Sequence, residues 1–252
     1  MRVAIFSDVH GNLSGMEAVL ADMERQRPDL VVFAGDLCLF GPRPAECWRL
    51  LRERRIPAVI GNTDAWLAGA GGAPEKHQPS LAWTQPRLPA DELAALGRLP
   101  FSLRVSPTAR ATDDLLIVHA NPRNLDDIIF PSEADQLAHW QRVRQPDAEL
   151  EPLLGDLEAA VMVYGHLHIP GIRQWGRLTL VNVASVNMPG DKDGRAKYAL
   201  LEWDGGRWSV DHRRVAYNVA AESAAFQTHQ PPRWQEAVAA LATDGYYYPQ
   251  QI

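Results

Sequence analysis

Seven side chains that can bind metal ions follow short apolar runs in the first two thirds of the chain. They are Asp8, His10, Asp36, Asn62, His119, His166 and His168. Carboxylate, imidazole and amide oxygen together favour Mn, Fe, Zn, Co or Ni over calcium. Seven ligands are too many for one small transition metal, but they suit two ions that share a bridging carboxylate. Such pairs of ions, typically ~3.5–4 Å apart, clamp the attacking and leaving oxygens of a displacement.

The spacing of these residues supports one shared site. Asp8 and His10 form an i, i+2 pair, as do His166 and His168. Because alternate residues of an extended segment point the same way, we expect both members of each pair to reach one centre. Taken singly, an aspartate after a strand usually forms a turn or caps a helix. A single histidine such as His119 is more often a hydrogen-bonded core residue. The complete set favours a two-metal centre.

The apolar runs before these residues predict the framework that positions them. Residues 3–6, 30–34 and 58–60 have the composition of buried strands. Between them, helical spacing runs from Met16 to Met23, with Asn12 or Ser14 as cap and Pro28 as terminator, and a second helix starts near Pro44. This β-α-β-α-β order indicates a buried parallel sheet, in which ligands gather at the carboxyl ends of the strands. Asp8, Asp36 and Asn62 would all lie at that edge.

The rest of the chain predicts a second sheet. Residues 65–90 have the character of a surface excursion with one helix, and further helices are expected over 91–99, 133–144 and 234–242. Strands are expected at 103–105, 115–118, 161–164, 179–183, 198–203 and 208–213, the last three antiparallel. We therefore expect an α/β fold of four layers, α-β-β-α. Two mixed sheets would pack face to face with helices outside and the metal site at the carboxyl-terminal rim of the strands.

One domain is expected to span residues 1–252, with a core of about 1–215. A helical extension of about 217–252 would either cover the body or contact a partner. The chain is 46% hydrophobic and carries a formal net charge of −6. It has no run of lysine and arginine, which argues against nucleic acid and an anionic membrane surface as partners.

Localisation is expected to be cytoplasmic. Cys38 and Cys47 are the two cysteines, which favours reduced thiols, and the N-terminus does not have the pattern of a signal peptide. No apolar stretch approaches the ~18 residues that a membrane span needs. The sequence carries no indication of an oligomeric state.

The order of the motifs resembles that of a known family. The segments Asp8-Val9-His10, Gly35-Asp36, Gly61-Asn62-Thr63-Asp64, Val118-His119 and Gly165-His166-Leu167-His168 resemble the D-x-H, G-D, G-N-H-D/E, H and G-H-x-H blocks of the calcineurin-like metallophosphoesterase superfamily. The likeness covers residues 1 to about 215. Residues 40–44, 119–122 and 182–200 further resemble its small bacterial and archaeal phosphodiesterase branch. The fold of that family, a β-sandwich flanked by helices, agrees with the expected layers.

The resemblance implies roles for individual residues. Asp8, His10 and His168 would hold one divalent metal ion, and Asn62, His119 and His166 the other, with Asp36 bridging. Manganese or iron is favoured, with nickel, cobalt, zinc and magnesium as alternatives. The family mechanism is attack on phosphorus by a metal-bound hydroxide. It implies a metal-dependent phosphoesterase acting on a small phosphate ester, with catalytic roles for Asp36, Asn62 and Asp64.

A charge count favours a phosphodiester substrate. Two divalent ions supply four positive charges, while Asp8, Asp36 and a hydroxide supply three negative ones. The single remaining positive charge matches the single negative charge of a diester.

The clearest departure from the family pattern is Thr63, where many members have a histidine that serves the leaving group. A threonine is no general acid near neutral pH, and losing such an acid typically costs on the order of 10²–10⁴ in rate. Two interpretations follow: catalysis is lost, or the enzyme prefers good leaving groups or receives help from another side chain. Asp64 is expected to orient a neighbouring ligand.

Substrate contacts are expected from Asn12, at the start of a helix, and from Thr63 and Asn121. Arg43, Arg195 and Lys197 are weaker candidates for phosphate contacts. Three other functions compete with a phosphodiesterase: a non-catalytic metal-binding scaffold on the same fold, a phosphomonoesterase and a nuclease. The complete ligand set argues against the scaffold, and the acidic composition argues against the nuclease.

Overall fold

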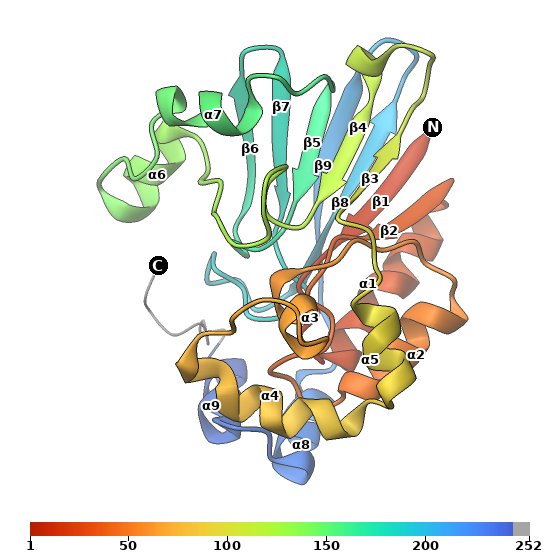
Figure 1. Cartoon of the computed structure of the whole chain (residues 1–252), viewed down its shortest axis with the longest axis vertical. Helices are drawn as coiled ribbons and strands as arrows, with labels where there is room; N and C mark the ends of the chain where they lie inside the picture. The colour runs from red at the N-terminus through yellow and green to blue at the C-terminus, as the bar shows by residue number, and fades with distance from the viewer. Residues whose placement is uncertain (244–252) are drawn as a thin grey trace.

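Short aliphatic runs form two β-sheets in the computed structural model, which describes residues 1–243 (Figure 1). The first sheet has the strand order β2-β1-β8-β9. Its strands are β1 (Arg2–Phe6), β2 (Leu30–Phe33), β8 (Ala196–Trp203) and β9 (Trp208–Val215). β1 is parallel to β2, whereas β8 is antiparallel to both β1 and β9. This sheet is therefore mixed.

The second sheet is also mixed and has the order β3-β4-β5-β7-β6. Its strands are β3 (Ser102–Val105), β4 (Leu115–Val118), β5 (Val161–Tyr164), β6 (Pro170–Trp175) and β7 (Leu178–Val183). The three central strands are parallel, and the edge strands β3 and β6 are antiparallel to their neighbours. The carboxyl ends of β4 and β5 thus lie at the same edge, where His119 and His166 follow them.

Alternation along the strands builds the core. Val3 and Ile5 of β1 belong to a buried cluster with Ile117 and Val163 of the other sheet. Ala4 and Phe6 point the opposite way, into a cluster with the helices α1 (Leu13–Gln26) and α2 (Pro44–Glu53). Because side chains alternate between the two faces of a strand, each sheet buries one face against the other sheet.

The outer face of the second sheet is covered in the same way. Met162 and Tyr164 of β5 pack with Leu150 of η4 (Asp147–Leu150) and Leu154 of α7 (Glu151–Leu154). Figure 1 shows α6 (Glu133–Trp140) and α7 beside β6 and β7, and α1 and α2 on the opposite side of the molecule. The four layers α-β-β-α are as expected from the sequence.

The segment 65–90 is more ordered than expected. It contains two α-helices, α3 (Asn62–Leu67) and α4 (Gln78–Thr84), with the short 3₁₀ turns η1 (Glu75–His77) and η2 (Gln85–Arg87). Leu81 and Leu88 are buried in the main core cluster, which anchors the segment to the body. The expectation of a single helix was therefore wrong, whereas most of the segment is exposed, as expected for a surface excursion. α5 (Ala90–Leu96) follows, close to the helix expected over 91–99, and a third 3₁₀ turn, η3 (Ala111–Asp113), precedes β4.

Other boundaries differ for identifiable reasons. The strand expected at 58–60 forms only an isolated bridge between Ala58 and Phe33. Pro57 has no N–H to donate, and the N–H of Ile60 donates to the carbonyl of Pro100 instead. The helix expected to reach residue 144 ends at Trp140, because Gln141 takes a left-handed backbone with φ of 57°.

Some elements were not expected, and one pairing was wrong. β6, α7 and α8 (Val219–His229) had no counterpart among the elements expected from the sequence. The strand expected over 179–183 was predicted to be antiparallel, and β7 is antiparallel to β6 but parallel to β5. The cause is that β6 returns the chain beside the sheet, so that β7 re-enters it in the direction of β5.

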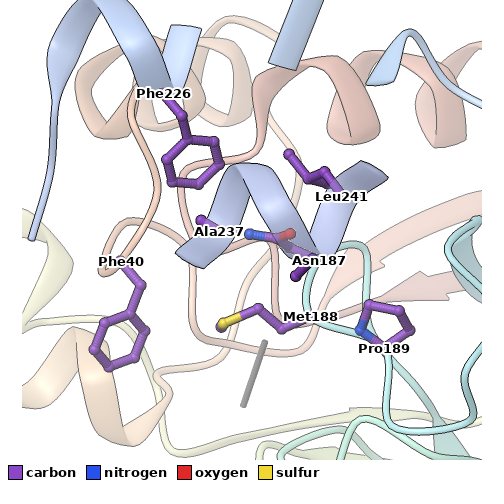
Figure 2. A pocket seen from close by; sticks show the side chains of 8 residues that line it. Phe40, Asn187, Met188, Pro189, Phe226, Ala237 and Leu241 are labelled. Carbon is purple, nitrogen blue, oxygen red and sulfur yellow. The ribbon is translucent and has the colours of Figure 1, made fainter. Parts of the chain in front are cut away.

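The helix expected over 234–242 is present as α9 (Trp234–Ala242). Phe226 of α8 and Ala237 of α9 are buried, and together with Leu241 they face Phe40 and Met188 across a small pocket (Figure 2). The described part of the extension thus covers the loops at the carboxyl ends of the strands. Tyr246, Tyr247 and Tyr248, singled out in the sequence, lie outside the described residues. Within residues 1–243, no helix is both long and apolar enough to cross a membrane.

Candidate metal centre

Two Asp/His triads lie side by side at the carboxyl ends of the strands. Asp8, His10 and His168 form the first, and Asp36, His119 and His166 form the second. In each triad, one ligand atom from every residue lies within 4.8 Å of the other two. Five of these six residues are buried, and only His166 is partly exposed. The geometry is that of a dinuclear metal site. We refer to the two triads together with Asn62 as the metal cage.

Asp36 lies between the triads. Its Oδ2 is 3.7 Å from Nε2 of His10, and its Oδ1 is 3.5 Å from Nε2 of His119. One carboxylate thus has an oxygen directed toward each triad, which is the arrangement that a bridging ligand needs. Asn62 joins the second triad, because its Oδ1 is 3.0 Å from Nε2 of His119. The structure therefore brings together all seven residues selected from the sequence.

Each histidine of the cage has one ring nitrogen held by a backbone carbonyl. The contacts are His10 Nδ1 to Leu39 O at 3.2 Å, His119 Nδ1 to Ala34 O at 2.9 Å, His168 Nδ1 to Met188 O at 2.8 Å and His166 Nε2 to Asp126 O at 2.9 Å. A carbonyl oxygen only accepts, so these nitrogens carry the proton. In the neutral ring the other nitrogen then presents a lone pair to the centre, which is the usual way that metal-binding histidines are oriented.

The lone pairs face one another. Nε2 of His10 is 3.3 Å from Nε2 of His168, and Nε2 of His119 is 3.2 Å from Nδ1 of His166. Two lone pairs at that distance repel unless a cation or a proton lies between them. Imidazole nitrogens and carboxylate oxygens are the donors that divalent transition metals take in proteins. The donor set and its orientation therefore fit divalent metal ions.

The charges of the cage residues shift one another's pKa values. Burial lowers the pKa of His119 and His168, but the charges of Asp36 near His119 and of Asp8 near His168 outweigh it, so both pKa values are raised. Burial and the neighbouring His119 instead lower the pKa of His166 to about 4. Burial also acts to raise the pKa of Asp8, but His168 and His10 hold it well below its usual range. The cage is built around positive charge.

The backbone of the cage is left-handed at five positions. Positive φ angles occur at Asp8 (54°), His10 (45°), Asp36 (66°), His166 (64°) and His168 (62°). Aspartate and histidine are among the few residues that enter this region with any frequency. The i, i+2 pairs thus converge through tight turns, and the explanation by extended segments was wrong. Such clustering of unusual backbone is typical of functional sites.

Asp64 supports the cage from behind. Its Oδ2 accepts from the N–H groups of Asp36 (2.8 Å) and Gly61 (3.0 Å), and its Oδ1 accepts from that of Leu37 (3.0 Å). Burial and the charge of Asp36 raise its pKa to about 6, against these three hydrogen bonds. Gly61 is needed beside it, because a Cβ there would collide with Asp36. The carboxylate of Asp64 thus fixes the turn that carries Asp36.

Asn12 and Asn121 have structural contacts of their own. Oδ1 of Asn12 accepts from the N–H of Gly15 at 2.8 Å, as the cap of α1. Oδ1 of Asn121 accepts from the N–H groups of Arg123 and Asn124, and its Nδ2 donates to the carbonyl of Asp127. These bonds shape the loop whose Asp126 carbonyl holds His166. The positions favour supporting roles over substrate contact for both asparagines.

The basic candidates are also engaged elsewhere. Arg43 pairs with the buried Glu222 of α8. Lys197 is buried and bonded to Asp191 at 3.0 Å, while Arg195 pairs with Asp193. The structure does not bring these three cations to the cage.

A cavity opens beside the cage. Its lining consists of five cage residues (His10, Asp36, Asn62, His166 and His168) together with Thr63, Phe40, Trp66 and His77. We call Phe40, Trp66 and His77 the aromatic wall. His77 stacks on Trp66 with ring centres 5.6 Å apart and planes 21° apart, and it meets the edge of Phe40 at 5.1 Å.

Sequence reasoning missed the aromatic wall. Trp66 and His77 lie in the stretch interpreted as a surface excursion, and neither follows a strand. The one available signal was the position of Trp66, three residues after Thr63 at the start of what proved to be a helix.

Comparison with known proteins agrees with this geometry. A family model described as the calcineurin-like phosphoesterase superfamily domain matches residues 1–206. Among curated sequences, the uncharacterized protein MJ0912 of Methanocaldococcus jannaschii is 24% identical over 252 residues, covering 92% of this chain and 94% of that protein.

Two solved structures cover nearly the whole chain. A metallophosphoesterase from Sphaerobacter thermophilus is 27% identical with a TM-score of 0.72, covering 97% of this chain and 99% of that one. The hypothetical protein PH1004 from Pyrococcus horikoshii OT3 is 17% identical with a TM-score of 0.79 and the same coverage, which is a likeness of fold.

Proposed function

This chain belongs to the calcineurin-like phosphoesterase superfamily, and we propose that it is a phosphodiesterase that hydrolyses a small phosphate ester. The observation that carries the proposal is the pair of facing Asp/His triads, with Asp36 directed toward both. We assign Asp8, His10 and His168 to one ion and Asn62, His119 and His166 to the other, with Asp36 as the bridge. Manganese or iron is the favoured pair of ions.

Two divalent ions held there would lower the pKa of a water molecule for attack and neutralise charge that develops on the phosphoryl oxygens. The protein supplies orientation. Backbone carbonyls fix the histidine tautomers, and Asp64 fixes the turn of Asp36. Because a misplaced ligand moves the reacting atoms, this preorganisation is itself part of catalysis.

The cavity lining supports a diester over a monoester. Among the described residues that line it, none is a lysine or an arginine. A dianionic monoester would lack a second source of positive charge there. The aromatic wall instead offers an apolar surface for an organic group, and a diester carries two such groups where a monoester carries one.

The test is a metal add-back assay. The purified protein is stripped of metal, reloaded with Mn, Fe, Co, Ni, Zn or Mg singly, and given an aryl phosphodiester and the matching monoester. We expect faster cleavage of the diester with at least one metal. Faster cleavage of the monoester would contradict the diester preference. Bound metal without turnover of either ester would instead support a scaffold function.

A further inference from the structure

Thr63 stands where related sequences carry a histidine acid, and the nearby His77 can supply that function instead. Thr63 and Trp66 are three residues apart on α3, so their side chains share one face of that helix. His77 stacks on Trp66 at 5.6 Å between ring centres. Its imidazole therefore lies one stacked ring away from the position where related sequences carry a histidine. The chain reaches the same region from a different segment.

His77 is held in place without using its ring nitrogens. The N–H of His77 donates to the carbonyl of Pro74, and Gln78 and Gln85 donate from their side chains to the carbonyls of Ala73 and Leu67. Among residues 1–243, no hydrogen bond involves the imidazole nitrogens of His77. The ring is half-buried and lines the cavity together with the cage. The ring of His77 is therefore fixed in position while its nitrogens are available to a substrate.

Thr63 is a second polar group without a partner in the same cavity. Thr63 is only 3% exposed, and its buried hydroxyl oxygen has no hydrogen-bond partner within the described residues. An unpaired buried hydroxyl is destabilising, and a ligand in the cavity would supply the missing partner. Two unused polar groups thus lie together beside the cage.

We propose that His77 is a catalytic residue that protonates the leaving-group oxygen, and that the Thr63 hydroxyl hydrogen-bonds to the same end of the substrate. This inference rests on the proposed phosphodiesterase function and names the group that replaces the missing histidine. It also defines the substrate further: one ester group of the diester stands against Trp66, His77 and Phe40.

The proton balance of the step is simple. The bond between phosphorus and the leaving oxygen breaks, and its electron pair stays on that oxygen. An N–H proton of the His77 imidazolium moves to the oxygen, so that an alcohol or phenol departs and neutral His77 remains. His77 then regains its proton from solvent.

The charges around His77 favour the neutral ring until substrate binds. Burial lowers its pKa to about 4, and the cations Lys76 of η1 and Arg233 before α9 act in the same direction. An anionic phosphate in the cavity opposes these cations and favours the imidazolium. Protonation is thereby coupled to substrate binding.

The test compares esters with good and poor leaving groups. His77→Phe keeps a ring against Trp66 but removes both nitrogens. We expect kcat/KM for a phenyl or alkyl diester to fall on the order of 10²–10⁴-fold, and that for a 4-nitrophenyl diester by less than about tenfold. His77→Asn keeps a donor that is no acid and should show the same split, while the nearby exposed Glu75→Gln should not.

Two further measurements make the result decisive. Metal content of each variant should match the parent, and adding Thr63→His to His77→Phe should restore much of the lost rate with the poor leaving group. Equal losses for both esters, or no loss for either, would overturn the assignment of His77 while leaving the diesterase intact. Absence of turnover in the parent protein would instead overturn the proposed function.

Discussion

The metal cage and the aromatic wall meet at one cavity but are held in different ways. Every histidine of the cage has a backbone carbonyl on its outer nitrogen, and His119 and His168 are almost fully buried. His77 in the wall is half-buried, and ring stacking holds it. The cage therefore has one geometry built into the folded chain, whereas the wall can adjust to the group placed against it. We expect the cage to control metal binding and the wall to control which leaving groups are accepted.

Asp36→Asn should cause the largest loss of activity, and the loss should be the same for good and poor leaving groups. The amide cannot bridge two cations with two anionic oxygens, so both ions are weakened. Since a metal site contributes several kcal/mol to the transition state, kcat/KM should fall on the order of 10³-fold or more. Assays with good and poor leaving groups, together with metal analysis, check this.

The matched control is Asp211→Asn, which removes an exposed carboxylate in β9 and should leave activity unchanged. A leaving-group-dependent loss in Asp36→Asn would break the division between cage and wall.

Asp64→Asn should weaken the cage without touching a ligand. The carboxylate of Asp64 now accepts hydrogen bonds from three backbone N–H groups. The amide N–H₂ of asparagine would face at least one of these donors and could not accept from it. We expect metal affinity to fall about 10–100-fold, as for other residues that support metal ligands. Titration of the metal-free variant with Mn measures this. An unchanged affinity would show that the turn of Asp36 holds by itself.

Lowering the pH should release metal from the cage before it protonates His77 of the aromatic wall. The pKa values of His119 and His168 are raised above the ordinary value of 6.5, and a metal ion must displace those protons. As the pH is lowered, metal affinity should therefore start to fall before pH 6.5 is reached. It should then decrease about tenfold per pH unit for each proton that the metal displaces. His77, with a pKa of about 4, does not titrate in that window in the free protein.

Metal binding followed by calorimetry between pH 5 and 8 checks this, with proton release read from buffers of different ionisation enthalpy. Affinity independent of pH over the same range would contradict the raised values.

Asn12→Ala should have the smallest effect, on stability alone. The variant loses the cap of α1, and caps of this kind contribute about 1 kcal/mol to the free energy of unfolding. Asn218→Ala, which removes the equivalent cap of α8, is the matched control. Urea unfolding of both should give similar losses, with KM unchanged. A raised KM in Asn12→Ala alone would restore the original prediction of a substrate contact.

The cage was accessible from the sequence because its residues follow strands. An apolar run that ends in a polar turn is a local signal, and the topology then collects such turns at one edge. The backbone at these turns was not accessible, because the left-handed residues Asp8 and His168 form backbone hydrogen bonds with Gly35 and Gly190, more than twenty residues along the chain. The right residues were thus selected with a wrong local explanation.

The wall was inaccessible for a different reason. Nothing between Trp66 and His77 carries a periodic pattern, and their contact depends on how Leu81 and Leu88 anchor the following helix in the core. The failed strand at 58–60 has a similar origin, since Ile60 bonds to Pro100, forty residues on. Long-range contacts of this kind leave no trace in local composition.

The left-handed backbone of the cage changes how its residues should be replaced. At positive φ, any residue with a Cβ other than asparagine, aspartate or histidine is strained, by about 1–2 kcal/mol. Alanine at Asp8 or His168 would therefore delete a ligand and distort a turn at once, and the two consequences could not be separated. Glycine enters this region freely. A glycine scan of Asp8, His10, Asp36, His166 and His168, unlike the customary alanine scan, would report the loss of the ligand alone.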